Sequence, residues 1–385
     1  MSPFIWLGRM IARRKPLRQE YDIFFLFPFY HVGGAEKVHA DILRVVENKK
    51  TIIFFTRRSQ SEALLHLFRR PHVTIVDISR YTDNKPLYFL SFIYRGVISG
   101  YIHAQRKPPV VFNGQSNFGY KVSPWINNTV PQIELIHSFC SFSYIRMPFI
   151  AFYRQSLTVS KGVLDEHLAL YRRWGVPPAL DARFSYIENK IDLPGPQPEK
   201  PATGPLTVLY VGRGTPEKRA YLVAAIAEAV HVTHPDVRFQ FMGDVEADIP
   251  ENLRPHCIFL GDQREVEKVE AVYRQAHVLV VPSSTESGPL VFMEGMAFGL
   301  AVLATPTGIM PEHLVNGRNG YLFSSITNVP VIMEEGRGHI VHWQGHRGEL
   351  AAIARENAAY AQAHFGKEQF LENYRQLFKH INQGN

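Results

Sequence analysis

Short apolar runs alternate with segments of helical periodicity along most of the chain. The runs at 51–55, 278–281 and 301–304 carry no charge and are mostly aliphatic or aromatic, which is typical of strands buried on both faces of a parallel sheet. Between such runs, apolar residues recur every three or four positions, as they do between 35 and 45, which predicts amphipathic helices. The alternation predicts an α/β protein built from doubly wound parallel sheets.

The same pattern predicts the remaining elements. Further strands are expected at 22–27, 73–78, 110–112, 133–136, 157–160, 206–211, 239–242 and 258–260. An apolar and aromatic helix is expected at 87–102, buried or interfacial rather than membrane-spanning, and two final helices are expected after residue 348. Residues 324–346 follow no pattern that predicts an element.

A length of 385 residues suggests two domains. The stretch 194–205 is rich in proline and glycine, which indicates an interdomain linker. We therefore expect a basic amphipathic segment at 1–20, a first domain at 21–193, the linker, a second domain at 206–365, and a last helix at 366–385.

Charge and cysteine usage narrow the function classes. The net charge of +7 and the pI near 9.3 favour anionic surroundings: a membrane surface, phosphate-bearing substrates or nucleic acid. Nucleic acid is the least favoured of these because no nucleic-acid-binding motif accompanies the charge. The two cysteines, Cys140 and Cys257, are far apart in sequence, so neither a disulfide framework nor a metal cluster is indicated, and a reducing compartment fits.

The first 20 residues mix apolar and basic side chains. The apolar part is too short to span a membrane, and its basic residues follow rather than precede it, unlike a signal peptide. Two interpretations stay open: a short helix lying on anionic lipid, or a frayed tail.

Residues 278–304 suggest a phosphate-binding β–loop–α–β unit. Glu286 stands at the exit of the loop, and Pro289 suits the start of a helix. The free N–H groups at that start, including those of Leu290 and Val291, suit a phosphate, and Glu294 about one turn inside the helix suits the hydroxyls of a ribose. Glu294 stands in an otherwise apolar helix, so we expect it to need a hydrogen-bonding partner. This arrangement predicts a nucleotide-sugar site.

A second strand-to-helix turn, at 212–218, contains Arg213 and Lys218. Two cations five residues apart across a glycine-containing turn can converge on one diphosphate, although they could also be solvated surface charges. The strand at 239–242 ends at Gly243, which we include among the donor-binding residues.

The first domain offers two candidates. Gly33 and Gly34 separate a strand from a helix, which would let a ligand approach the backbone closely, or simply make a tight turn. His137 follows the strand at 133–136, at the strand end where open α/β sheets bind ligands, although a lone histidine is often structural.

Together these motifs resemble a known family. Glu286 and Glu294, spaced Glu-x7-Glu and followed by Gly-Leu-Ala-Val and Thr-Gly-Ile-Met-Pro-Glu, are similar to the C-terminal half of retaining GT-B glycosyltransferases, group 1 or family 4-like. Gly-Gly-Ala-Glu-Lys at 33–37 resembles the family's first loop. The sequence departs from the family at Pro289 and Ala301, and Ile309 stands where a glycine is usual.

The resemblance implies two Rossmann-like doubly wound domains facing each other across a cleft, with a C-terminal helix crossing back. It implies that Arg213 and Lys218 neutralise the leaving nucleoside diphosphate, Glu286 orients the sugar, Glu294 holds the ribose, and His137 contacts the sugar from the first domain.

The expected function is retaining transfer from a nucleotide-sugar donor to a glycan or lipid-linked acceptor, in polysaccharide or lipopolysaccharide biosynthesis. No Asp-x-Asp occurs, so neither a metal nor another cofactor is expected. The expected location is cytoplasmic, with contact at the inner face of the membrane left open. Three alternatives stay open: a nucleotide-sugar epimerase on the same fold, a catalytically silent nucleotide-sugar-binding protein, and, least favoured, a nucleic-acid binder.

Overall fold

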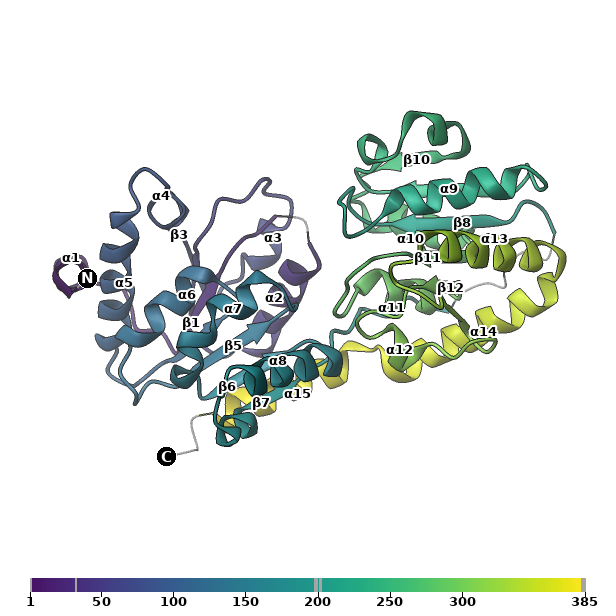
Figure 1. Ribbon diagram of the computed structural model, residues 1–385. Helices are drawn as coiled ribbons and strands as arrows, with labels where there is room; N and C mark the ends of the chain where they lie inside the picture. Colours follow the sequence, from purple (N-terminus) through teal and green to yellow (C-terminus); the bar gives the residue numbers. More distant parts are fainter. Residues whose placement is uncertain (1, 32, 197–199, 201–202, 382–385) are drawn as a thin grey trace. The chain divides into compact units, whose positions relative to one another are not determined.

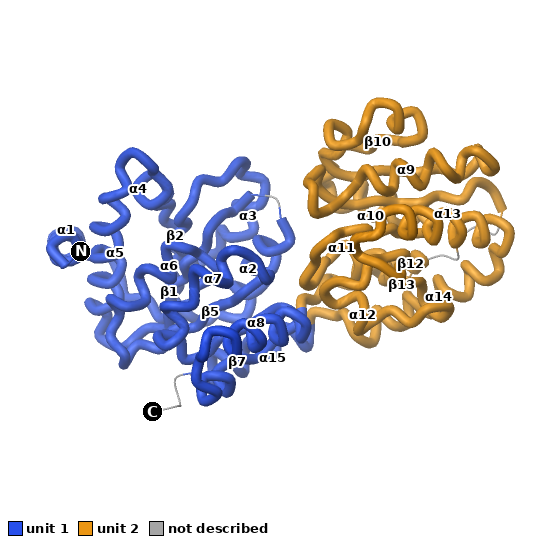
Figure 2. Tube along the Cα trace, in the orientation of Figure 1, with its two compact units in different colours: residues 1–188, 368–385 blue, residues 189–367 orange. Residues whose placement is uncertain are grey.

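A computed structural model describes all residues except 1, 32, 197–199, 201–202 and 382–385. The chain forms two compact units, which are described separately (Figure 2). Unit 1 comprises residues 1–188 and 368–385, and unit 2 comprises residues 189–367.

In its described residues, unit 1 contains a seven-stranded parallel sheet in the order β3-β2-β1-β4-β5-β6-β7 (Figure 1). Its strands are β1 (Ile23–Phe27), β2 (Thr51–Phe55), β3 (Val73–Asp77), β4 (Val110–Asn113), β5 (Gln132–Ile136), β6 (Gln155–Thr158) and β7 (Phe184–Tyr186). Its helices are α1 (Ser2–Arg14), α2 (Gly34–Val45), α3 (Leu65–Phe68), α4 (Ser79–Thr82), α5 (Phe89–His103), α6 (Asn117–Val122), α7 (Ser141–Ile145), α8 (Lys161–Arg173) and α15 (Lys367–His380).

Every residue of β1 is buried, as its uninterrupted apolar sequence predicts. Ile23, Phe25 and Phe27 pack into the core shared with α2 and α15. Phe24 and Leu26 point to the opposite face, into the core shared with α5 and α6. The last helix, α15, therefore belongs to the core of unit 1, to which it contributes Phe370 and Tyr374.

Unit 2 has, in its described residues, a six-stranded parallel sheet in the order β10-β9-β8-β11-β12-β13. Its strands are β8 (Thr207–Val211), β9 (Arg238–Met242), β10 (Ile258–Gly261), β11 (Val278–Val281), β12 (Ala301–Ala304) and β13 (Gly320–Leu322). Its helices are α9 (Ala220–His231), α10 (Val266–Gln275), α11 (Leu290–Ala297), α12 (Met310–His313), α13 (Val329–Gly345) and α14 (Arg347–His364).

The helix α13 occupies the stretch for which the sequence pattern predicted no element. Its N-cap Asn328 accepts a hydrogen bond from the N–H of Val331, and Ile332, Ile340 and Trp343 are buried. Gly336 obscures the helical pattern in the sequence, because glycine lowers helix propensity by about 1 kcal/mol. Here it allows close packing, since a Cβ on Gly336 would lie 2.6 Å from Ile226 of α9.

The boundary between the units precedes the predicted linker. Ile191 already packs in a core of unit 2, and the carbonyl of Pro194 accepts a hydrogen bond from Gln362. Lys200 donates to the carbonyls of Tyr273 and Arg274. The described residues of 194–205 are thus anchored to unit 2; residues 197–199 and 201–202 lie outside the description. The composition indicated a linker. Hydrogen bonds to two carbonyls of α10 and from one side chain of α14 hold the described part of this segment on unit 2.

No helix in the described part of the chain combines the length and the apolar character that crossing a bilayer requires.

Candidate functional site

The switch point of the unit 2 sheet lies between β8 and β11. From β8 the chain moves outward through β9 and β10, whereas β11 begins a second progression through β12 and β13. In open parallel sheets, ligands bind outside the carboxyl ends of the strands at such a point. The loops that follow β8 and β11 contain Arg213 and Lys218 on one side and Glu286 on the other.

The structure joins Lys218 directly to Glu286. The Lys218 Nζ donates to Glu286 Oε1 across 2.6 Å, and the same oxygen accepts from Ser283 Oγ at 2.7 Å. Only 8% of the Glu286 side chain is exposed, against 23% for Lys218, so solvent screens the pair poorly. An ammonium has three N–H donors, so Lys218 can hold Glu286 and still donate to further oxygens.

The structure does not place Arg213 in this pair. Its guanidinium lies 3.9 Å from the carboxylate of Glu217, and 67% of the side chain is exposed. Arg213 lies on the same loop as Lys218, so the predicted convergence on one diphosphate requires its long side chain to turn toward that ligand.

Gly243 has a packing role in the loop that follows β9. Its φ of 124° lies outside the range that other residues adopt readily, and a Cβ there would lie 1.9 Å from the carbonyl oxygen of Gly212. The loops after β8 and β9 therefore touch through their backbones at this glycine.

The helix α11 begins at Leu290, with Pro289 as its N-cap rather than at the predicted first helical position, and Leu290 and Val291 are its first two residues. The first N–H groups of a helix have no partner within the helix, so this end of α11 suits an anion. Glu294 lies one turn further in, where its Oε2 accepts a hydrogen bond of 2.8 Å from the hydroxyl of Tyr273 on α10. Tyr273 is the partner that a carboxylate in an apolar helix was expected to need.

Ile309 fits the loop that its unusual identity left uncertain. Its side chain is buried, and its N–H donates to the carbonyl of Ser287 at 3.0 Å. The neighbouring Gly308, at φ 57°, lets the two loop backbones lie close together, since a Cβ there would lie 2.5 Å from the same carbonyl oxygen of Ser287.

Arg219 is a residue that sequence reasoning missed. It precedes α9 with a left-handed backbone, φ 53°, and its side chain is buried. Its Nε donates to the carbonyl of Pro282 and its Nη1 to that of Ile326, both across 2.6 Å. Arg219 thereby ties the loop that carries Lys218 to the loop that carries Glu286.

The sheet of unit 1 has its own switch point, between β1 and β4. Gly33 is the N-cap of α2 and Gly34 its first residue, so the glycine pair lies at the end of the loop that connects β1 to α2. His137 follows β5, and its N–H donates to the side-chain oxygen of Gln115, which itself follows β4.

His137 contacts a second histidine that the sequence analysis did not single out. Its Nε2 lies 2.8 Å from Nε2 of His39, which is fully buried on α2 and stacks on Phe27. The signal for His39 is a polar residue directly between the apolar residues Val38 and Ala40 of a predicted helix.

Both histidines are neutral at pH 7. Burial lowers the pKa of His137 to about 4, and burial together with the neighbouring His137 holds the pKa of His39 well below its usual value. One ring must therefore donate and the other accept at the shared hydrogen bond, which fixes complementary tautomers. A neutral imidazole held in one tautomer suits a hydrogen bond to a sugar hydroxyl better than proton transfer near pH 7.

The structure thus places the candidate residues in two groups. Unit 2 carries Glu294 and the α11 terminus beside the Lys218–Glu286 contact, with Arg213 and Gly243 on adjacent loops, and unit 1 carries His137, Gly33 and Gly34. In the described residues, no group of three or more His, Cys, Asp or Glu side chains is arranged to hold a metal ion.

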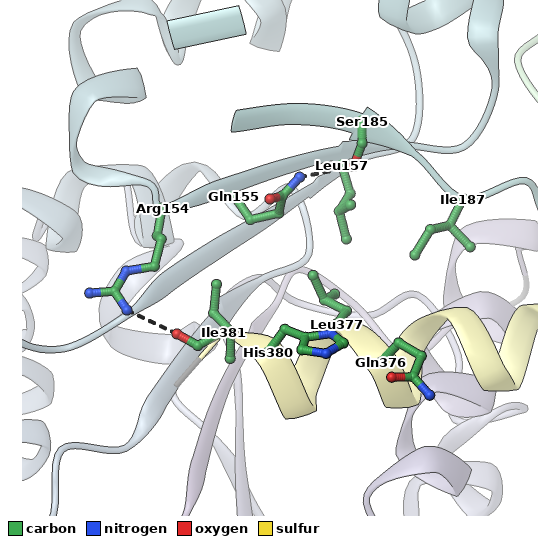
Figure 3. A pocket seen from close by; sticks show the side chains of 9 residues that line it. All are labelled: Arg154, Gln155, Leu157, Ser185, Ile187, Gln376, Leu377, His380 and Ile381. Atoms are coloured by element: carbon green, nitrogen blue, oxygen red, sulfur yellow. Dashed lines mark hydrogen bonds between the residues drawn. The ribbon is translucent and has the colours of Figure 1, made fainter. Parts of the chain in front are cut away.

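A pocket of about 380 Å³ lies in unit 1, between strands β6 and β7 and the helix α15 (Figure 3). Leu157, Ile187 and Leu377 line it, and Arg154 donates to the carbonyl of Ile381 at its rim. The pocket lies where α15 packs on unit 1, and it contains none of the candidate residues.

Comparison with known families identifies the domain that carries the Lys218–Glu286 contact. Residues 205–331 match the model of the family described as glycosyl transferases group 1. This part of unit 2 is therefore similar to the group 1 glycosyl transferases. The match spans the strands β8 to β13 and both loops that form the contact.

Curated proteins that are similar to this chain match it over part of their own lengths. The sulfoquinovosyl transferase SQD2 of Arabidopsis thaliana is 30% identical over 178 residues, covering 44% of this chain and 32% of that protein. The α-maltose-1-phosphate synthase of Mycolicibacterium smegmatis is 27% identical over 291 residues, covering 67% of each. The chain thus spans between about a third and two thirds of these two relatives.

Solved structures show the fold of the whole chain. The crystal structure of Anabaena HepE in complex with UDP and glucose matches with a TM-score of 0.69 at 16% identity, covering 95% of this chain and 100% of that one. The fold is GT-B, with two Rossmann-like parallel-sheet units.

Proposed function

We propose that this protein is a retaining glycosyltransferase that moves a sugar from a nucleotide-sugar donor to a glycan or lipid-linked acceptor, in polysaccharide or lipopolysaccharide biosynthesis. The observation that carries the proposal is the Lys218–Glu286 contact at the switch point of the unit 2 sheet, beside the start of α11. This arrangement places a cation, a helix N-terminus and a carboxylate where a parallel sheet binds its ligand.

The donor diphosphate would be held by Lys218, Arg213 and the N–H groups of Leu290 and Val291. Lys218 has donors to spare beyond its bond to Glu286, and the exposed side chain of Arg213 can turn toward a phosphate. Glu294, held by Tyr273, suits the two ribose hydroxyls. Support for a nucleotide-sugar donor comes from HepE, which has UDP and glucose bound, and from relatives named as a sugar transferase and a sugar-phosphate synthase.

In the proposed reaction, the bond between the anomeric carbon and the diphosphate oxygen breaks. The acceptor oxygen bonds to the same carbon on the same face, and its proton passes to the departing phosphate oxygen. Lys218, Arg213 and the α11 terminus stabilise the charge that develops on the diphosphate, so these cations supply what a metal ion could supply elsewhere. Glu286 orients the sugar hydroxyls, and neutral His137 of unit 1 offers a further hydrogen bond.

The proposal includes a cytoplasmic location and no nucleic-acid partner. It extends to a metal-free reaction, which predicts that EDTA leaves transfer unchanged.

The double variant R213A/K218A tests the assignment. A thermal-shift screen over nucleoside diphosphates first identifies the base, because a ligand that binds only the native state raises the melting temperature. Transfer from the matching nucleotide sugars is then followed by mass spectrometry. We expect R213A/K218A to lose transfer by at least about 100-fold, the effect of removing preorganised charge from a developing anion.

The matched control is R264A/K268A, which removes two paired, exposed cations from another part of unit 2. We expect this control to transfer normally. Because removing Lys218 leaves the Glu286 carboxylate without its cationic partner, the melting temperature of both variants is measured as well. Near-normal transfer by a folded R213A/K218A would refute the assignment. Conversion of the donor without acceptor would indicate an epimerase, and binding without turnover a silent binding protein.

A further inference from the structure

The helix α1 is fixed to unit 1 by close packing on α5. A Cβ on Gly8 would lie 2.0 Å from the carbonyl oxygen of Ile93, and one on Gly96 would lie 2.1 Å from that of Ile5. Such contacts are possible only between helices whose facing residues are small. Arg9 adds a hydrogen bond of 2.9 Å to the carbonyl of Trp125. Residues 2–14 of the N-terminal segment therefore form a helix packed on unit 1, and the frayed-tail interpretation is wrong for them.

The two helices run in the same direction. Phe4 stacks on Phe92, Gly8 lies against Gly96, and Ala12 lies against Gly100, so equal steps along α1 match equal steps along α5. The N-terminal ends of both helices therefore lie together. Figure 2 shows α1 beside α5 with no other element of unit 1 on its outer side.

This outer surface is unusually apolar for one that no described element of unit 1 covers. Of sixteen exposed large apolar side chains in the described residues, seven lie on α1 or at the start of α5: Phe4, Trp6, Leu7, Ile11, Leu87, Tyr88 and Phe89. Trp6 is 63% exposed. A concentration of this kind marks an interaction surface rather than scattered surface apolar residues.

The charge beside this surface has one sign. Arg13, Arg14, Lys15 and Arg18 are exposed, and residues 2–19 contain no aspartate or glutamate. Thirteen residues at 1.5 Å each give α1 a length of about 20 Å, which is too short to cross a hydrocarbon core of about 30 Å. A helix with aromatic and aliphatic side chains outward and cations alongside suits the plane of an anionic bilayer.

We propose that the α1–α5 surface, defined by these seven apolar side chains and four cations, docks unit 1 on an anionic phospholipid surface. Apolar side chains enter the interfacial region, where tryptophan is favoured, and the cations contact phosphate headgroups. Membrane docking goes beyond sugar transfer. It also deepens the proposed function, since a lipid-linked acceptor would be met at this surface.

Vesicle co-sedimentation tests the apolar part of the surface. Phosphatidylcholine vesicles are compared with vesicles of 70% phosphatidylcholine and 30% phosphatidylglycerol. We expect the wild type to bind the phosphatidylglycerol vesicles, to lose binding as salt rises, and to bind phosphatidylcholine alone weakly. The variant W6E/L7E/I11E should lose at least tenfold in affinity. The matched control V232E/V266E/V315E changes three exposed valines of unit 2 in the same way and should bind like the wild type.

A second pair of variants tests the charge. R13Q/R14Q/K15Q should bind phosphatidylglycerol vesicles at least tenfold more weakly, since each basic residue near an anionic surface contributes about 1 kcal/mol. K49Q/K50Q/R69Q removes the same charge from exposed positions following α2 and α3, whose apolar faces pack on the opposite side of the sheet from α5, and should bind normally.

Three outcomes would overturn the proposal: no binding by the wild type, equal loss in the test and control variants, or a dimer in solution that W6E/L7E/I11E dissociates. The last would assign the surface to a second copy of the chain. All measurements are made without donor or acceptor, so failure of the proposed function would leave their result unchanged.

Discussion

At the scale of the residue, two side chains hold strained backbone beside the candidate groups. Gln115 and Arg219 are the non-glycine residues with positive φ in the described chain, at 59° and 53°. Gln115 accepts the His137 N–H, and Arg219 joins the loops that carry Lys218 and Glu286. A left-handed backbone costs a non-glycine residue roughly 1–2 kcal/mol, and the side-chain hydrogen bonds offset this cost where loop geometry matters.

Replacing Arg219 by glycine and by alanine separates the cost of the left-handed backbone from the contribution of the side-chain hydrogen bonds. Both variants lose the hydrogen bonds to Pro282 and Ile326, but only alanine keeps the strained φ. We therefore expect R219A to lower the free energy of unfolding of unit 2 by about 1 kcal/mol more than R219G does. Urea denaturation measures the difference. Equal stability of the two variants would mean that the backbone relaxes at this position.

The hydrogen bond between Tyr273 and Glu294 predicts an effect on the KM for the donor. Y273F keeps the stack on Phe298, with ring centroids 5.2 Å apart, but removes the hydroxyl that holds Glu294. We expect Y273F to raise the KM for the donor about fivefold, the equivalent of about 1 kcal/mol for the loss of one hydrogen bond, with kcat nearly unchanged. E294Q should raise KM further. A fall in kcat alone would argue against ribose binding at Glu294.

At the scale of the element, the fit between α1 and α5 depends on glycine. In G96A the added methyl would lie 2.1 Å from the Ile5 carbonyl oxygen, a backbone atom that cannot move without its helix. We expect α1 to separate from α5, and trypsin to cleave after Arg9, Arg13 or Arg14 at least tenfold faster than in the wild type. The control is G338A in α13, where a Cβ would meet nothing within 4 Å and alanine should stabilise the helix by about 1 kcal/mol.

Elements were predictable from the sequence where one physical signal dominated. The strands β2, β11 and β12 have the predicted bounds, because an uncharged apolar run of four or five residues has few alternatives in an α/β chain. The helix α13 was missed because glycines within it weaken the periodicity. The short strand β7 was missed because Phe184–Tyr186 is too brief to show a pattern.

In the candidate site, too, some features were predictable from the sequence and others were not. Motif positions such as Glu286 and Lys218 were visible in the sequence, but their direct contact was not, since it joins loops 68 residues apart. The contacts of His39, Ser283 and Arg219 likewise depend on which loops meet at the sheet edge. Secondary-structure propensity and motif spacing do not show which loops contact each other.

At the scale of the whole molecule, the chain passes between the two units twice, after residue 188 and before residue 368. Unit 1 consequently contains both ends of the chain, and its core is completed only when α15 is added. Unit 1 also contains the three histidines whose pKa values are lowered most clearly by burial, His39, His137 and His167. The two units should therefore differ in their response to acid.

We expect unit 1 to lose stability first as the pH falls below about 6.5. Burial and the nearby Arg146 lower the pKa of His167 to about 4, whereas a histidine in the unfolded chain titrates near 6.5. Between these values the unfolded state binds more protons, so stability is fully present above 6.5 and falls with pH until the folded ring titrates. For His167 alone the loss at pH 5 is about 2 kcal/mol relative to pH 7.5. Urea denaturation at the two pH values, with hydrogen exchange to assign each transition to a unit, measures it.

The variant H167F identifies the source of this loss. Phenylalanine fits the aromatic surroundings of His167, which include Phe139 and Phe184, and it gives up only the hydrogen bond to the Val163 carbonyl. H167F should therefore be slightly less stable at pH 7.5 and yet lose less stability than the wild type on going to pH 5. H66F, which changes an exposed histidine of the same unit, should keep the wild-type pH dependence. If H167F retained the full acid sensitivity, the loss would arise from other groups of unit 1, which include the His39–His137 pair, His72 and His103, whose pKa values burial also lowers. The same experiment with H39F would test the contribution of the His39–His137 pair, because the phenylalanine ring could still stack on Phe27 without taking up a proton.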